Sequence, residues 1–316
     1  MRKILLLALG GTIACVPTKR GLMPKLRARE LIAQIRIPWG VAVTGEDFLK
    51  RTVLFPQDWN AVATKIFREY DAFDGFVITL GTDSLAYTAA ALSLALQNLS
   101  KPVVLTGAMR PLHHPRTDAK KNLRAAIAVA AKRGVGGVCV VFNGAIMPGA
   151  TVSKVRSDSV DAFESINEKP LGHVRGQKVM WLRRSFARRG RLRLAPHFEM
   201  NVANITLMPQ TQPQFVRALK KYRGVLVEGY GDGNVPSNLI RDFKGLALKK
   251  VLVLASQCAY GAVGHHYEGG SALVRAGALS ADAMTKETAL VKLMWALGQA
   301  KSNKEARRIF STYRVA

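Results

Sequence analysis

The feature that most constrains the fold is a repeated alternation of short apolar runs with longer amphipathic segments. Continuous apolar runs of strand length, typical of strands buried on both faces, lie at residues 4–9, 75–80, 103–106 and 137–142. Apolar residues recur at three- and four-residue spacing in residues 57–70, 84–99 and 118–132, which indicates helices. Ser84 and Asp118 are candidate N-caps for the last two helices.

This order predicts an α/β fold with a doubly wound, mostly parallel sheet, whose ligands bind at the carboxyl ends of the strands. The alternation resumes later, with strands expected at residues 204–208, 224–228 and 250–255 and helices at 214–222, 237–243 and 285–299. A basic stretch at residues 183–193 is either a cationic patch or, as we favour, a solvated connection. We therefore expect a larger N-terminal catalytic α/β domain at residues 1–190, a linker at 191–202 and a smaller C-terminal α/β domain at 203–316.

The charge balance is strongly basic, with 47 Lys and Arg residues against 21 Asp and Glu residues and a formal net charge of +26. Such a balance favours contact with polyanions and would steer an anionic substrate toward a basic cleft. The sequence nevertheless contains no zinc finger and no aromatic-basic recognition motif. We expect a generally basic solvated surface, with nucleic-acid binding non-specific if it occurs.

Cysteine usage and the N-terminus indicate a cytoplasmic protein. Cys15, Cys139 and Cys258 are odd in number and far apart, so they form neither a disulfide framework nor a metal-ligand pattern. The basic and apolar start resembles part of a signal peptide, but its apolar run is short and leads directly into Gly10 and Gly11. No window approaches the ~20 apolar residues that a membrane helix needs, so we expect no membrane association.

Three polar positions fall where a doubly wound sheet places its active site. Thr12 follows the first strand on a Gly-Gly turn, and glycines there expose N–H donors to a ligand. Thr82 and Asp83 follow the second strand and open a helix, whose N-terminal amides favour negative charge. Lys154 comes shortly after the fourth strand. Each feature alone is commonly a turn, a helix cap or a surface lysine, but a weak hydroxyl nucleophile needs a base, and a lysine can serve.

Motifs in order along nearly the whole chain resemble those of the bacterial-type L-asparaginases. Residues 8–14 (ALGGTIA) resemble the first signature of the family, and residues 79–88 (TLGTDSLAYT) resemble the second. Further matches are 106–109 (TGAM), 153–156 (SKVR), 161–165 (DAFES), 229–234 (GYGDGN) and 284–288 (MTKET). The resemblance is strongest to the cytoplasmic, type I and archaeal branch of the asparaginase/glutaminase superfamily.

The resemblance implies an amidase that converts L-asparagine to L-aspartate and ammonia without a metal or an organic cofactor. Thr12 matches the family nucleophile, and Thr82, Asp83 and Lys154 match the set that helps to activate the nucleophile or the hydrolytic water. Asp83 also pairs with the substrate α-ammonium, and the backbone amide of Thr82 is a candidate oxyanion donor. The implied substrate-binding set comprises Gly11, Gly81, Asp83, Arg51, Thr52, Ala108 and Asn234. A homodimer or homotetramer follows by the same analogy, because the loop of Asn234 reaches a neighbouring subunit in relatives.

The sequence departs from the family pattern at three positions. Leu22 stands where a tyrosine of the mobile lid contacts the nucleophile, and Leu80 replaces a histidine before the second signature. Counting back from residues 56–59 (PQDW), Lys50 and Arg51 occupy the place of an Asp-Ser pair whose serine binds the substrate carboxylate. Arg51 could bind that carboxylate in a bidentate manner, or Thr52 could replace the serine. We interpret these changes as altered specificity for Asn, Gln or a D-amide before loss of activity.

Two alternative functions remain open. One is the amidase subunit of an archaeal tRNA-dependent amidotransferase, although the first candidate catalytic strand starts at residue 4 and leaves no room for the N-terminal barrel of that subunit. The other is a catalytically silent relative that acts as a basic binding protein, against which the intact catalytic set argues. Cys258 resembles a position near the allosteric site of some type I members. The adjacent pairs 113–114 and 265–266 are histidines without metal-ligand spacing, and we assign them to polar loops.

Overall fold

The computed structural model describes residues 1–19, 21–176, 178–183, 190–264 and 268–314. The chain divides into two compact units, one from Met1 to Pro196 and the other from His197 onward. The division falls inside the segment expected as the linker, although Arg193–Leu194 of that segment forms the short strand β14, which pairs with β6 (Leu96–Gln97) of the first unit. Within the described residues, no helix combines the length and the apolar character needed to cross a bilayer.

The first unit is built on a mixed sheet of eight strands in the order β13-β12-β9-β8-β7-β5-β1-β4. Five neighbouring strands are parallel, namely β4 (Val41–Arg51), β1 (Arg2–Gly10), β5 (Gly75–Thr79), β7 (Pro102–Thr106) and β8 (Gly137–Phe142). The remaining three extend the sheet in antiparallel fashion, namely β9 (Ala145–Pro148), β12 (Gly172–Arg175) and β13 (Lys178–Trp181). The four expected strands correspond to β1, β5, β7 and β8.

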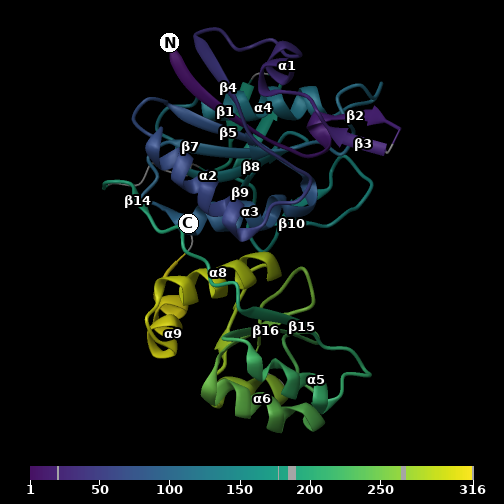
Figure 1. Ribbon diagram of the computed structural model, residues 1–316, viewed down its shortest axis with the longest axis vertical. Helices are drawn as coiled ribbons and strands as arrows, with labels where there is room; N and C mark the ends of the chain where they lie inside the picture. The colour runs from purple at the N-terminus through teal and green to yellow at the C-terminus, as the bar shows by residue number, and fades with distance from the viewer. Residues whose placement is uncertain (20, 177, 184–189, 265–267, 315–316) are drawn as a thin grey trace. The chain divides into compact units, whose positions relative to one another are not determined.

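Helices cover both faces of this sheet, as buried apolar strands require. Side chains of β1 alternate between the faces, and Ile4, Leu6 and Ala8 share a buried cluster with α1 (Ala28–Ala33) and α4 (Ala119–Ala130). Figure 1 shows α2 (Pro56–Arg68) and α3 (Thr82–Ala95) on the opposite side of the sheet. The Trp59 indole of α2 donates a hydrogen bond to Thr88 Oγ1 of α3 at 3.1 Å, which ties these two helices together.

Two short hairpins extend from the sheet near the ends of its strands. A turn of 3-10 helix, η1 (Thr12–Ala14), follows β1 and leads into the hairpin β2 (Cys15–Thr18) and β3 (Gly21–Pro24). The other hairpin pairs β10 (Val152–Lys154) with β11 (Phe163–Ser165), so that Lys154 lies opposite Phe163. Contacts join β10 to α3, which brings the end of this hairpin to the helix that follows β5.

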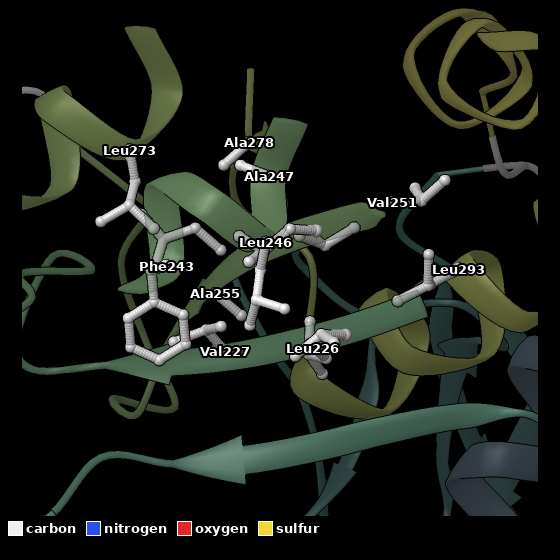
Figure 2. Packing of buried hydrophobic residues seen from close by; sticks show 14 of the residues in the cluster. Leu226, Val227, Phe243, Leu246, Ala247, Val251, Ala255, Leu273, Ala278 and Leu293 are labelled. Atoms are coloured by element: carbon white, nitrogen blue, oxygen red, sulfur yellow. The ribbon is translucent and has the colours of Figure 1, made fainter. Parts of the chain in front are cut away.

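The second unit has its own parallel sheet of four strands, in the order β15 (Val202–Thr206), β16 (Gly224–Gly229), β17 (Val251–Ser256) and β18 (Leu279–Ser280). Its helices and helical turns are α5 (Pro213–Ala218), η2 (Leu219–Lys221), α6 (Ser237–Lys249), α7 (Glu268–Arg275), α8 (Lys286–Gln299) and α9 (Asn303–Thr312). Figure 2 shows Phe243 and Leu246 of α6 in one buried cluster with Leu226 and Val227 of β16. Leu293 of α8 joins the same cluster, so this unit has an independent core.

The predicted α/β class, with a larger mostly parallel N-terminal sheet and a smaller C-terminal α/β unit, is confirmed. The prediction that Ser84 is an N-cap is wrong, because α3 begins at Thr82 and Ser84 Oγ instead accepts a hydrogen bond from Leu54 N at 3.1 Å. Asp118 does occupy the N-cap position of α4, but its carboxylate makes no capping bond and accepts from Met109 N and Arg110 N. The strand β4 was not predicted.

Candidate active site

The predicted site residues of the first unit follow neighbouring parallel strands at one edge of the sheet. Register aligns Ala8 of β1 with Thr79 of β5, and Thr79 with Thr106 of β7. A bulge in β4 places Arg51 beside Gly10. Because parallel strands end at the same edge, the segments that begin at Gly11, Thr52, Leu80 and Gly107 converge there.

The segments that begin at Gly11, Thr52 and Leu80 pack closely on one another through backbone atoms. Gly11 has φ +77°, and a Cβ on it would lie 2.2 Å from Gly81 N. A Cβ on Gly81 would lie 2.0 Å from Thr52 O. Gly11 N also donates to Arg51 O at 3.1 Å. Only glycine fits at these two contacts, and this places Thr12 next to the segment that carries Thr82.

Thr82 lies at the first position of α3, 7% exposed, with Gly81 as the N-cap. Gly81 has no side chain that could cap this end of the helix, so no N-cap side chain occupies the first amides of α3. The loop after β7 packs against it, since a Cβ on Gly107 would lie 3.5 Å from Thr82 Cγ2. These amides and the helix dipole favour an anionic group at this position.

Lys154 reaches Thr82 and Asp83 from the end of β10. Its Nζ donates to Thr82 Oγ1 at 2.9 Å and to Asp83 Oδ1 at 2.6 Å. The Lys154 side chain is 21% exposed, whereas the Asp83 side chain is 73% exposed. The ammonium therefore lies between a buried hydroxyl and a carboxylate that remains accessible to a ligand.

Arg51 forms an ion pair with Asp58, which was not among the predicted site residues. Its Nε lies 3.1 Å from Asp58 Oδ1, and the Asp58 side chain is only 5% exposed. Asp58 Oδ2 accepts from Phe55 N at 2.8 Å, which closes the first turn of α2. Asp58 belongs to the PQDW stretch at the start of α2. An acidic residue at the third position of a helix often caps the helix start, and this pattern could have indicated a structural role for Asp58.

Ala108 is fully buried, and the loop that carries it is fixed by α4. Asn122 Nδ2 donates to Gly107 O at 3.1 Å and to Asp118 Oδ2 at 3.0 Å. Asp118 in turn holds the amides of the two residues after Ala108. Asn122 and this role of Asp118 were not predicted, because helical spacing alone does not show which loop a buried polar side chain contacts.

The residues that depart from the family pattern lie in different settings. Leu22 is opposite Pro17 in the β2–β3 hairpin and is 49% exposed. Leu80 is fully buried, and its amide donates to Thr106 O at 3.1 Å. A leucine at position 80 therefore serves the core between β5 and β7, whereas Leu22 leaves an apolar side chain on the hairpin that follows Thr12.

Asn234 belongs to the second unit, whereas the other predicted site residues belong to the first. Its side-chain oxygen accepts from Val235 N at 3.0 Å, and its backbone pairs with Tyr230. Cys258 is exposed in the same unit. In the first unit, His114 Nδ1 accepts from Arg116 N in a loop, and residues 265–266 lie outside the described part of the chain. No group of three or more His, Cys, Asp or Glu side chains in the described ranges is arranged to hold a metal ion.

Family models match both units of the chain. The model described as Asparaginase, N-terminal, matches residues 3–187, and the one described as Glutaminase/Asparaginase C-terminal domain matches residues 201–310. The chain belongs to the asparaginase family. The family that the motifs predicted is thus confirmed, and so is the asparaginase class of enzyme.

Individual relatives of this asparaginase-family chain cover almost its full length. An L-asparaginase of Thermococcus kodakarensis is 39% identical over 97% of this chain and 96% of that protein, and L-asparaginase 1 of Escherichia coli K12 is 32% identical over 96% and 94%. A glutamyl-tRNA(Gln) amidotransferase subunit of Pyrococcus furiosus is 34% identical over 98% of this chain and 75% of that protein. The solved structure of a thermostable L-asparaginase from Thermococcus kodakarensis superposes with a TM-score of 0.93 at 38% identity, covering 98% of this chain and 97% of that one.

Proposed function

We propose that this protein is an L-asparaginase that hydrolyses L-asparagine to L-aspartate and ammonia with Thr12 as the nucleophile. The observation that carries the proposal is the placement of Lys154 Nζ between Thr82 Oγ1 and Asp83 Oδ1, at the sheet edge where Gly11 packs on Gly81. A hydroxyl nucleophile, an ammonium and open helix amides in one place are what acyl transfer from an amide requires.

In the first step, the Thr12 oxygen attacks the side-chain amide carbon and loses its proton. The amide oxygen becomes negatively charged and accepts a hydrogen bond from the amide of Thr82, at the start of α3, a type of contact worth ~10²–10³ in rate. The tetrahedral intermediate then expels ammonia, which carries away the proton, and leaves an ester between aspartate and Thr12. No metal or organic cofactor enters this sequence.

In the second step, water attacks the ester and regenerates Thr12. Thr82 relays the proton of the attacking water to the departing Thr12 oxygen, because the Lys154 ammonium that donates to its oxygen stabilises negative charge on that oxygen while the proton is passed on. Asp83 holds Lys154 through Oδ1, and its exposed position leaves the carboxylate accessible to the α-ammonium of the substrate.

The substrate carboxylate binds beside Arg51 and Thr52, which the packing of Gly11 and Gly81 holds next to the two threonines. Arg51 uses Nε for Asp58, and the remaining edge of its guanidinium is available for a bidentate contact. Gly11, Gly81 and Ala108 shape the pocket by keeping its walls small. We place Asn234 in the substrate site of a neighbouring subunit of a homodimer or homotetramer, and we propose a cytoplasmic location on the basis of three free cysteines.

The proposal is tested by measuring ammonia release from L-asparagine, L-glutamine and their D-forms. We expect L-asparagine to be the preferred substrate of the wild type. Thr12→Ala removes the nucleophile, so its activity is expected to fall by at least about 10³-fold. Thr312→Ala, at an exposed threonine of α9 in the second unit, is the matched control and keeps its activity. A wild type that releases no ammonia from any amide, or a Thr12→Ala variant with unchanged activity, would contradict the proposal.

A second candidate function is that of an amidase subunit related to the tRNA-dependent amidotransferases. The observation that favours it is the similarity to the amidotransferase subunit of Pyrococcus furiosus, whose length the chain covers to 75%. Specific tRNA binding would then persist at about 0.3 M salt, whereas binding through net charge alone falls steeply over that range. Filter binding with tRNA across a salt series separates the two, and salt-sensitive binding of all RNAs alike excludes this candidate.

A further inference from the structure

A tryptophan at the amino-terminal edge of the first sheet is completely exposed. Trp39 is 100% exposed, whereas Trp59 and Trp295 are 5% and 3% exposed. It lies just before β4, and Arg2 N at the start of β1 donates to Gly40 O at 2.7 Å. The backbone of this segment is therefore held in place while the indole contributes nothing to the core. Tryptophan is enriched among the residues that dominate binding interfaces, so an indole presented on a fixed backbone is a candidate contact for a ligand.

Trp39 forms one wall of a concavity of about 490 Å³. The other lining residues are Met1, Arg2, Gly40 and Arg133, which all come from segments at or before the start of parallel strands. Met1 is 88% exposed and adds a second apolar wall. The volume is ample for a base together with its sugar and phosphate, and Gly40 contributes no side chain that would fill it.

The surroundings of the concavity are cationic. Asp74 is the acidic group next to it, and its pKa is lowered first by the hydrogen bond from the Lys3 amide and then by the charges of Arg2, Lys101 and Arg133. Arg2 is committed to Asp74, with Nη1 at 2.7 Å from its Oδ1. Lys101 is committed to the carbonyls of Tyr70 and Phe73. Arg133 lines the concavity, is exposed, and leaves net positive charge at the rim.

We propose that this concavity binds single-stranded nucleic acid, with a base stacked on Trp39 and a neighbouring phosphate contacted by Arg133. Stacking on an exposed aromatic side chain beside cations is the general mode by which proteins bind single strands without sequence preference. The formal net charge of +26 gives the long-range attraction for a polyanion.

Two other occupants fit these observations less well. A second copy of the chain would bring the same cations together across the contact, which like-charge repulsion opposes. A bilayer would need a broader apolar surface than Met1 and Trp39 provide. The nucleic-acid site is independent of the amidase site, because β1 separates the two edges by its length of about 26 Å. In Figure 1, β1 starts at the N-terminus and leads away from it toward the β2–β3 hairpin.

The test is fluorescence anisotropy with a labelled oligothymidine of about 15 nucleotides, long enough to span one site, and the full-length chain. Trp39→Ala is expected to weaken binding about ten-fold, and Trp39→Phe, which keeps a stacking surface, less than about three-fold. Arg133→Gln is expected to weaken binding several-fold and to lower the salt slope by about one, as loss of one phosphate contact does. Arg308→Gln on α9 removes the same charge from an exposed position in the other unit and serves as the control.

Further measurements separate base stacking from charge attraction and test the other occupants. An abasic oligomer of equal length is expected to bind wild type and Trp39→Ala equally, and ammonia release by Trp39→Ala is expected to match the wild type. The proposal is overturned if the wild type does not bind the oligothymidine or if Trp39→Ala binds it as well as the wild type does. It is also overturned if Trp39→Ala loses binding to vesicles of phosphatidylserine and phosphatidylcholine, or changes the sedimentation of the protein, while its affinity for the oligothymidine is unchanged.

Discussion

Arg51 and Asp58 show how a buried carboxylate can orient a side chain that we propose binds the substrate. Asp58 is buried and keeps two partners, the Arg51 guanidinium and the Phe55 amide. Arg51 is about half exposed, so solvent screens the pair and its contribution to stability is small, about 0–1 kcal/mol. Its main effect is to orient the guanidinium beside the predicted carboxylate position.

Asp58→Asn removes the charge that orients Arg51 and keeps an oxygen for the Phe55 amide. The KM for L-asparagine is expected to rise roughly ten-fold with little change in kcat. A charged hydrogen bond from Arg51 to the substrate carboxylate contributes about 1.5–3 kcal/mol, and only part of it is lost because Arg51 is still present but no longer oriented. Steady-state ammonia release measures both constants. Asp71→Asn, an exposed carboxylate before β5, is the control, and an unchanged KM in Asp58→Asn would remove Arg51 from the substrate site.

Lys292 is a buried cation of the second unit. It lies 5% exposed on α8, 4.7 Å from the ring centroid of Phe310, and burial lowers its pKa to about 8, with Arg314 adding to the shift and Asp282 opposing it. Between pH 8 and the ordinary lysine pKa of 10.5 the unfolded chain binds the extra proton, so this residue makes stability rise with pH. Below pH 8 both states are protonated and the full cost of burying the charge remains.

Lys292→Met removes that cost and fills a similar volume. The unfolding temperature is expected to rise near pH 7, by the equivalent of about 1–2 kcal/mol after the lost contact with Phe310 is subtracted. The gain is expected to shrink as pH rises through the range from about 8 to 10.5. Thermal unfolding across that range measures it, with exposed Lys244→Met as the control, and a gain that is independent of pH would refute the assignment.

The contact of Lys154 with Thr82 and Asp83 could be predicted, because each of these residues lies in a motif at the end of a strand. The catalytic roles of these residues and of Thr12 stay predictions. No local pattern indicates the direction of the Arg51 side chain, and the Asp58 contact depends on how α2 packs. Ser84 was assigned as a cap because a serine before a helix is typical of one, but Gly81 and Thr82 already start α3.

At the scale of elements, the site depends on backbone contacts between turns. Gly11, Gly81 and the carbonyl of Thr52 form a stack in which a side chain would overlap main-chain atoms of the next turn. Such contacts cannot relax by side-chain rotation, so they determine the relative positions of the turns that carry Thr12 and Thr82.

Gly11→Ala tests this packing against a matched glycine. Gly11 and Gly134 have φ values of +77° and +69°, but a Cβ on Gly134 meets nothing within 4 Å. Gly134→Ala is therefore expected to cost only about 1–2 kcal/mol for the left-handed backbone and to keep activity. Gly11→Ala is expected to cost more and to lose most ammonia release, because the backbone at Gly81 must move. Equal thermal stability and equal activity of the two variants would contradict the packing argument.

Strands buried on both faces were predictable, whereas exposed strands were not. β1, β5, β7 and β8 are continuous apolar runs that only a central strand can accommodate. β4 is an edge strand with mostly exposed and half-exposed residues, so its sequence lacks that signal, although it carries Arg51. The antiparallel strands β9, β12 and β13 are four residues each, too short for a clear period of two.

At the scale of the molecule, the chain forms two compact units with separate cores, and most of the predicted site residues lie in the first of them. Every predicted site residue except Asn234 lies in the first unit. The basic stretch that precedes Pro196 and His197 indicated a boundary in this region of the chain. The pairing of β14 with β6 could not be predicted, because it joins segments far apart in the sequence. The charge of +26 is not explained by the motifs, and we link it to the edge that carries Trp39.

The most direct test of the whole account is the kcat of Lys154→Met for L-asparagine, measured by ammonia release on protein shown to be folded. Methionine keeps the length of the side chain and removes the ammonium that donates to Thr82 Oγ1. We predict that kcat falls at least about 100-fold while the unfolding temperature stays close to that of the wild type, and that Lys121→Met, at a lysine that donates to Asn143, keeps its activity. A folded Lys154→Met protein with the kcat of the wild type would show that the Lys154 ammonium does not act in the hydrolysis.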